Sequence, residues 1–146
     1  MKKLILCLFA ISTLAFVSCK KDKDYAKDWV GNYSVVANIH VDNLPVVGSI
    51  DRQMTYDGKV EATGENAVKL TIGEYTTVGT VDGSGLHVDP ATVEYPITAG
   101  VVAQVKVECP VIPPLQNGHT SAQAKLTASV MGMSVGGTAD IDITKK

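Results

Sequence analysis

The sequence predicts an all-β protein made of antiparallel strands, and three observations support this class. First, the 146-residue chain has nineteen valines after Cys19, and β-branched side chains favour the pleated surface of a sheet. Second, apolar and polar side chains alternate in several segments, which is typical of strands with one buried and one solvated face. Third, no segment has a sustained helical period, and only residues 25–30 are compatible with a single helical turn.

The alternation defines the strands in chain order. In the first run, residues 32–41, Tyr33 and Val35 lead the apolar face. The second run, residues 49–56, places Ile50, Arg52, Met54 and Tyr56 on one face and ends at Asp57-Gly58, a strong hairpin signal. Further runs lie at residues 68–72, 101–109, 121–130 and 134–143. With shorter strands in the middle of the chain, we expect about eight strands of ordinary length.

Turn signals separate these runs. Residues 64–66 and 82–85 have the composition of short loops, and residues 130–133 that of the last hairpin turn. Asp89-Pro90 and Tyr95-Pro96 are expected to break the middle of the chain, because proline cannot donate to a ladder. Residues 110–119 are the longest irregular piece.

The first eighteen residues have the layout of a secretory signal peptide. Two lysines precede an uncharged, mostly apolar run at residues 4–17, which is shorter than the roughly 20 residues of a membrane-spanning helix. The run closes on Phe16-Val17-Ser18-Cys19, which resembles the lipobox of bacterial lipoproteins. The resemblance implies that residues 1–18 are removed and that Cys19 carries acyl chains such as palmitate.

The residues after Cys19 are expected to form a flexible tether. Residues 19–28 include a run of mixed charges that cannot bury apolar surface. Residues 29–146 are enough for one domain and too few for two. We therefore expect a lipid-anchored protein of the cell envelope, with the outer membrane as the favoured location. The net charge of −2, with scattered basic residues, argues against nucleic acid as a partner.

A second resemblance concerns the domain itself. Trp29-Val30-Gly31-Asn32-Tyr33 resembles the W-x-G-x-Y start of small lipocalin-like (calycin-like) domains in bacterial lipoproteins, and residues 68–81 and 126–135 look like their middle and closing hairpins. The resemblance implies an eight-stranded antiparallel barrel with Trp29 as a plug at one end. From the residues alone, a two-sheet β-sandwich remains the alternative, since both arrangements protect the strands of such a chain.

Catalysis is not expected, and neither is a cofactor or a metal. His40, His87 and His119 have no spacing that forms a metal-site signature. Cys109 shares its face with valines, which predicts a buried and inert thiol. Asp140 and Asp142 lie on the polar face of the last strand and are expected to be solvated.

The barrel interior is the remaining candidate site, and the function predicted for it is binding of a small or apolar ligand. Arg52, Tyr33, Tyr56 and Met54 are the candidate ligand-binding residues. Arg52 either keeps its head group in water at a barrel end or faces an anionic group of a ligand, because an unpaired buried arginine is costly. The alternative function is a structural module with a filled interior, whose loops contact an envelope protein or a glycan.

Overall fold

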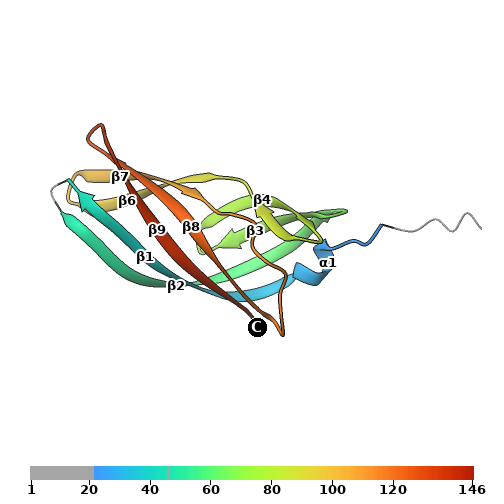
Figure 1. Ribbon diagram of the computed structural model, residues 1–146. Coiled ribbons are helices and arrows are strands. Elements are labelled where there is room, and N and C mark those ends of the chain that lie inside the picture. Colours follow the sequence, from blue (N-terminus) through green and yellow to red (C-terminus); the bar gives the residue numbers. More distant parts are fainter. Residues whose placement is uncertain (1–21, 46) are drawn as a thin grey trace, which may run out of the picture.

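The protein is an all-β molecule in which one antiparallel sheet curls into a half-barrel (Figure 1). The computed structural model describes residues 22–45 and 47–146. The elements are α1 (Ala26–Trp29), β1 (Gly31–Leu44), β2 (Gly48–Gly64), β3 (Ala67–Ile72), β4 (Tyr75–Asp82), β5 (Gly85–Val88), β6 (Ala91–Thr98), β7 (Val101–Glu108), β8 (His119–Val130) and β9 (Met133–Lys145). The predicted fold class, all-β and antiparallel with barrel-like curvature, is confirmed. In the described part of the chain no helix is long and apolar enough to cross a bilayer.

The strand order is β5-β4-β3-β2-β1-β9-β8-β7-β6. Strands that pair in the sheet are also consecutive in the sequence, with one exception: the first strand, β1, pairs with the last, β9. The strands β5 and β6 are the two edges, and only residues 89 and 90 connect them. The sheet is therefore a curled strip whose edges are consecutive in sequence.

The sheet has nine strands rather than the expected eight or so. The difference lies in the middle of the chain, where proline was expected to interrupt the strands. Pro96 lies inside β6, paired in register with Val102. Because β6 is an edge strand, one side of it has no ladder to complete, and a residue without an N–H group is tolerated there.

The prediction of a hairpin turn at Asp57-Gly58 is wrong. Strand β2 runs through both residues without a turn, and Gly58 pairs with Tyr33 of β1. A Cβ atom at Gly58 would lie 3.2 Å from a methyl group of Val35 and 3.5 Å from the Cβ atom of Tyr33. The glycine thus makes room for core side chains on the concave face of the strand, a close approach that glycine allows inside a sheet.

The other turn predictions are confirmed. Asn66 has a φ of 54° in the β2–β3 turn, and Met131 and Gly132 have φ values of 50° and 80° in the β8–β9 turn. Two consecutive positive φ values are the signature of a type I′ hairpin, whose twist matches that of the flanking strands.

The ordered domain begins before Trp29. The N–H group of Tyr25 donates a hydrogen bond of 2.8 Å to Oδ1 of Asn66, and Ala26 is fully buried. The last residues of the expected 19–28 tether are therefore packed against the β2–β3 turn, because the apolar side of α1 covers one end of the core. Cys19 and the expected signal peptide lie outside the described residues.

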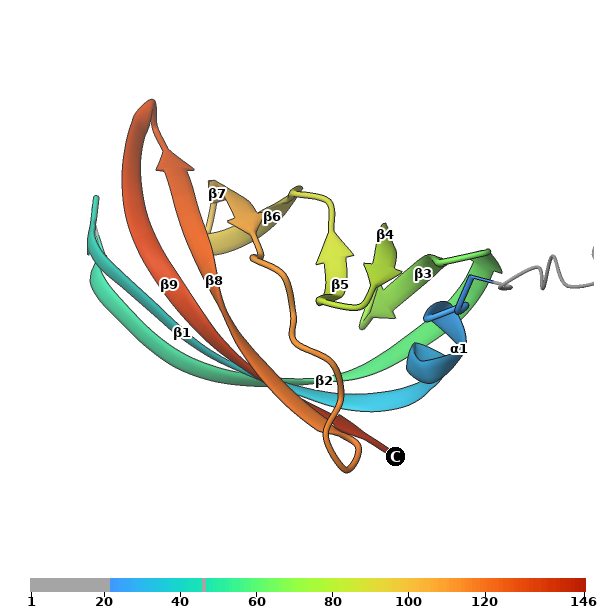
Figure 2. The same ribbon diagram turned by 45° about the vertical axis from the view of Figure 1, so that its right-hand side comes forward.

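Residues 109–118, here called the strap, cross the concave side of the sheet between β7 and β8 (Figure 2). Leu86 of β5 and Ile112 of the strap exchange two backbone hydrogen bonds of 2.9 Å. The hydroxyl of Thr120 donates to the carbonyl of Pro113 at 2.8 Å. The strap therefore joins edge strand β5 to the opposite side of the half-barrel, and the long irregular segment expected from the sequence is confirmed.

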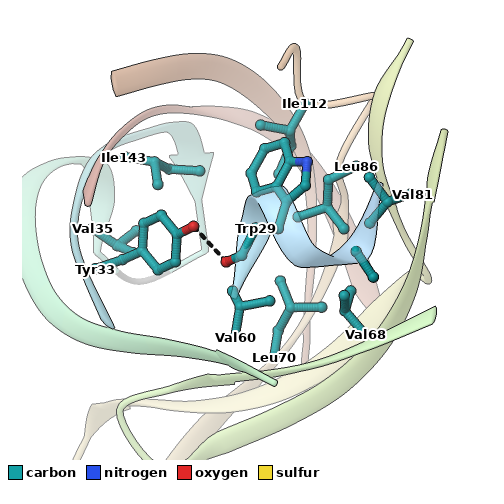
Figure 3. Close-up of a cluster of buried hydrophobic side chains, with 11 residues drawn as sticks. Trp29, Tyr33, Val35, Val60, Val68, Leu70, Val81, Leu86, Ile112 and Ile143 are labelled. Carbon is teal, nitrogen blue, oxygen red and sulfur yellow. Dashed lines mark hydrogen bonds between the residues drawn. The ribbon is translucent and has the colours of Figure 1, made fainter. Parts of the chain in front are cut away.

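The core consists of two clusters of buried side chains on the concave face. The α1 cluster gathers around Trp29 and Tyr33 and includes Leu86 and Ile112 (Figure 3). The second cluster is centred on β7, β8 and β9, and its buried members are Val41, Leu44, Ala103, Ala124, Leu126, Ala128, Val130 and Ala139. Cys109 and Ile141 pack against both clusters. The inward faces predicted from the alternation are confirmed for both halves of the sheet.

Candidate functional site

The concave face of the half-barrel carries a cavity of about 400 Å³. Its lining comes mainly from apolar side chains of the nine strands, with Trp29 and Ile112 at the α1 end. The residues of β1 that line it are Tyr33, Val35, Ala37, Ile39, Val41 and Leu44, and the first five are the inward set predicted from the two-residue alternation. This volume falls within the range of about 300–1,000 Å³ that is typical of small-molecule pockets.

The cavity reaches solvent at its exposed lining residues, and Arg52 is one of them. One guanidinium nitrogen of Arg52, on β2, donates a hydrogen bond of 2.5 Å to the hydroxyl of Tyr95 on β6. These strands are far apart in the sheet order, so the bond crosses the concave side from one arm of the strip to the other. We call Arg52, Tyr56, Tyr75 and Tyr95 the mouth cluster; all four line the cavity.

Within the mouth cluster, the neighbours of Tyr56 influence its pKa. Partial burial is the main cause that raises the pKa of Tyr56 above its ordinary value; Tyr75 and Tyr95 raise it further, and the positive charge of Arg52 opposes the shift. The hydroxyl of Tyr56 also lies 3.2 Å from the sulfur of Met54. At neutral pH Tyr56 is therefore a neutral phenol beside a permanent cation, with its hydroxyl directed at the sulfur of Met54.

Tyr33 lies in the core rather than at the mouth. Its side chain is 2 % exposed, and its hydroxyl donates a hydrogen bond of 2.5 Å to the backbone carbonyl of Trp29 (Figure 3). Burial raises the pKa of Tyr33 to about 12. The hydroxyl has its acceptor within the protein, so Tyr33 contributes its ring, and not a free polar group, to the cavity wall.

Trp29 is buried among the side chains of the α1 cluster, between Leu86, Ile112 and the residues of β2 and β3 (Figure 3). It belongs to the lining of the cavity at this end. The indole thus lies where α1, the strap and the sheet meet.

The histidines lie outside the cavity, each beside a carboxylate. His40 contacts Asp51 and Asp42 on the exposed side of β1 and β2, and hydrogen bonds with Asp51 first and Asp42 second raise its pKa. His87 lies 3.0 Å from Asp82. Hydrogen bonds from Ser84, followed by that with His87, lower the pKa of Asp82 to about 2.

Asp142 is half-exposed and has His119 at 3.9 Å. Asp140 is exposed and accepts a hydrogen bond of 2.7 Å from Gln123. Among residues 22–45 and 47–146, no three His, Cys, Asp or Glu side chains are grouped closely enough to hold a metal ion.

Cys109 is a half-buried free thiol at the start of the strap, and it lines the cavity. Burial raises the pKa of this thiol, which disfavours the reactive thiolate. None of the three histidines belongs to the cavity lining with it. The predicted burial of Cys109 is confirmed in part, since the side chain is half-buried.

Sequence reasoning missed Tyr75 and Tyr95 as site residues. Tyr95 precedes Pro96, and the pair was read as a strand break, whereas Val93, Tyr95 and Ile97 form the inward face of β6. The two-residue alternation through Val93-Glu94-Tyr95-Pro96-Ile97 was a usable signal. Tyr75 follows Gly73 and Glu74 in the β3–β4 hairpin, and its register partner is Ile72.

No protein-family model matches the chain, and no curated protein has significant sequence similarity to it. The fold and the site therefore define the class on their own: a one-sheet, antiparallel half-barrel with an apolar cavity on its concave face and a single arginine at the mouth.

Proposed function

We propose that this protein is a non-catalytic, lipocalin-like binding module that holds a small or apolar ligand on the concave side of its sheet. The observation that carries the proposal is the cavity of about 400 Å³, lined mostly by apolar side chains and reaching solvent at the mouth cluster. Burying apolar ligand surface in such a site contributes about 25 cal/mol per Å². In this proposal Trp29 closes the cavity at the α1 end, as its counterpart does in lipocalins.

The residues of the cavity favour binding over catalysis. Nucleophilic catalysis needs a thiol or hydroxyl beside a general base. The cavity holds one thiol, Cys109, whose pKa is raised by burial, and its lining includes no histidine. Its three charged residues, Arg52, Lys59 and Asp89, lie among apolar side chains, as specificity groups do in binding pockets.

The proposal places the protein in the cell envelope, attached to a membrane, with the outer membrane favoured. Its support is the apolar run at residues 4–17, which closes on Phe16-Val17-Ser18-Cys19. Replacing Cys19 by Ser is expected to move the protein from the membrane fraction to the soluble fraction. Continued membrane partition of Cys19→Ser, or a mature amino terminus without acyl chains by mass spectrometry, would contradict this part of the proposal.

Ligand binding is tested by native mass spectrometry of the protein purified from its host. A co-purifying small molecule, lost on denaturation, is the expected result. Extracts of the host should also raise the melting temperature, since a ligand at 100 times its Kd stabilises a protein by about 2.7 kcal/mol. Absence of both effects would refute the binding function.

A second candidate is an interaction module for an envelope protein or a glycan. It is favoured by the exposed tip of the β8–β9 hairpin, where Met131 is 75 % and Met133 is 54 % exposed. Methionine is adaptable and is common at promiscuous binding surfaces. Crosslinking from a photoreactive residue at position 131 to one defined envelope partner, together with an empty cavity in the native mass spectrum, would favour this candidate over the first.

A further inference from the structure

The guanidinium of Arg52 has no carboxylate partner within residues 22–45 and 47–146. None of the ion pairs in the described part of the chain includes Arg52. Its one side-chain partner in that part of the chain is the neutral hydroxyl of Tyr95. An arginine has five N–H donors in a planar fork that matches a carboxylate, so most of its donors remain free at the mouth of an apolar cavity.

The phenols around Arg52 extend this donor set. Because the oxygen of Tyr95 accepts a hydrogen bond from Arg52, the hydroxyl proton of Tyr95 remains free to be donated to another acceptor. Tyr75, Tyr95 and Arg52 all lie close enough to Tyr56 to influence its pKa. The mouth cluster therefore presents one fixed positive charge beside the free O–H donor of Tyr95, which suits a small anion.

The other charges of the lining limit the charge of that anion. Lys59 is already paired with Glu61 at 2.9 Å and is neutralised by it. Asp89 also lines the cavity and forms no ion pair with Arg52 within the described residues. A single unpaired cation, with a carboxylate in the same lining, favours one negative charge on the ligand over two.

We infer that the ligand is a monoanionic amphiphile whose small anionic head group, such as a carboxylate, binds Arg52 and Tyr95 at the mouth while its apolar chain lies along the concave face. This inference rests on the proposed binding function and names the ligand class for the same cavity. The cavity of about 400 Å³ lies near the lower end of the range typical of small-molecule pockets, which suits an alkyl chain of medium length.

The test compares three probes with the same twelve-carbon chain and different head groups. Dodecanoate, dodecanol and dodecyltrimethylammonium are titrated into the purified protein, and each Kd is measured by displacement of a fluorescent apolar dye. The expected order of affinity is dodecanoate, then dodecanol, then the cation. Arg52→Met is expected to weaken dodecanoate about tenfold, the loss that follows from removing one charge-assisted hydrogen bond, and to leave dodecanol unchanged.

One control variant and one further test variant complete the experiment. Lys125→Met removes one positive charge from the outer face of β8, where Lys125 is exposed and does not line the cavity. It is expected to leave all three Kd values unchanged. Tyr95→Phe removes the hydroxyl but keeps the ring and the cation, and about a threefold loss for dodecanoate alone is expected. Melting temperatures of all variants show whether each remains folded, which is expected because Arg52 is exposed.

The outcomes separate the two proposals. If dodecanoate and dodecanol bind equally, and Arg52→Met changes neither, the head-group inference is overturned while the binding function stands. If a loss of dodecanoate affinity occurs equally in Lys125→Met, the preference arises from overall charge and the inference is also overturned. If none of the three probes binds, both the inference and the proposed apolar cavity function are overturned.

Discussion

The buried hydroxyl of Tyr33 provides a direct test of the packing at the α1 end. Tyr33→Phe removes one oxygen from a side chain that is 2 % exposed and leaves the carbonyl of Trp29 without its donor. Removing one partner of a buried hydrogen bond costs about 1–3 kcal/mol. We therefore expect Tyr33→Phe to lower the free energy of unfolding by about 2 kcal/mol near neutral pH, measured by urea denaturation.

The same variant is expected to change the pH dependence. Burial raises the pKa of Tyr33 from 10.0 to about 12, so the unfolded chain loses this proton first. The stabilisation by the neutral phenol is complete below the unfolded pKa and is lost as pH rises through the folded pKa. One unit above the unfolded pKa the loss is about 1.4 kcal/mol, and the Phe variant does not suffer it. The difference between the two proteins is therefore expected to shrink to less than about 1 kcal/mol near pH 11.

Tyr75→Phe is the matched control, since the side chain of Tyr75 is 51 % exposed. Its free energy of unfolding is expected to stay within about 0.5 kcal/mol of the natural protein at each pH. If Tyr33→Phe is as stable as the natural protein near neutral pH, and both lose stability in parallel at alkaline pH, the buried hydrogen bond and the reasoning from it are refuted.

Two further outcomes are expected. Gly85→Ala should destabilise the protein by more than about 2 kcal/mol in the same assay, because a Cβ atom there would lie 2.0 Å from the carbonyl oxygen of Ile112 and the φ of Gly85 is +135°. Gly136→Ala is the control and should be nearly neutral, since a Cβ atom at Gly136 would have no neighbour within 4 Å. Equal effects of the two substitutions would contradict the close approach of β5 and the strap. The thiol of Cys109 should react with a disulfide reagent more slowly at mildly alkaline pH in the folded protein than in urea, because burial raises its pKa; equal rates would show that the cysteine is freely exposed.

The sequence predicts the faces of the strands well, because a two-residue alternation is a local property. Tyr33 and Val35 on β1, and Ala124 and Leu126 on β8, lie inward as their parity indicates. Burial on one face of a sheet requires only that each residue point opposite to its neighbours. The fold class and most inward residues follow from this pattern.

The errors arise where a local signal depends on distant residues. Asp57-Gly58 is a good turn sequence, but β1 continues beside it, and the long pairing of β1 with β2 keeps the chain extended. Whether Pro96 ends a strand depends on whether that strand lies at an edge, which is a property of the strand order. Neither fact can be derived from the residues near these positions.

The candidate site was predictable only in part, for a similar reason. Arg52, Met54 and Tyr56 were identified because they share a face within one strand. Their partner Tyr95 is 43 residues away and reaches Arg52 only because the strip curls. The mouth cluster is therefore a product of tertiary curvature, which periodicity does not encode.

The edge strands β5 and β6 do not pair with each other, and this has a mechanical consequence. A closed barrel has its radius fixed by the number of strands and their stagger. Here β5 and β6 are connected only by residues 89 and 90, and β5 forms two backbone hydrogen bonds with the strap through Leu86 and Ile112. The radius of the sheet is therefore not fixed by a complete ladder of hydrogen bonds between its edges. Bending of the strip can widen or narrow the hollow without breaking any bond between adjacent strands. Under the proposed binding function, the width of ligand that the cavity accepts changes with this bending, whereas a closed barrel keeps it fixed.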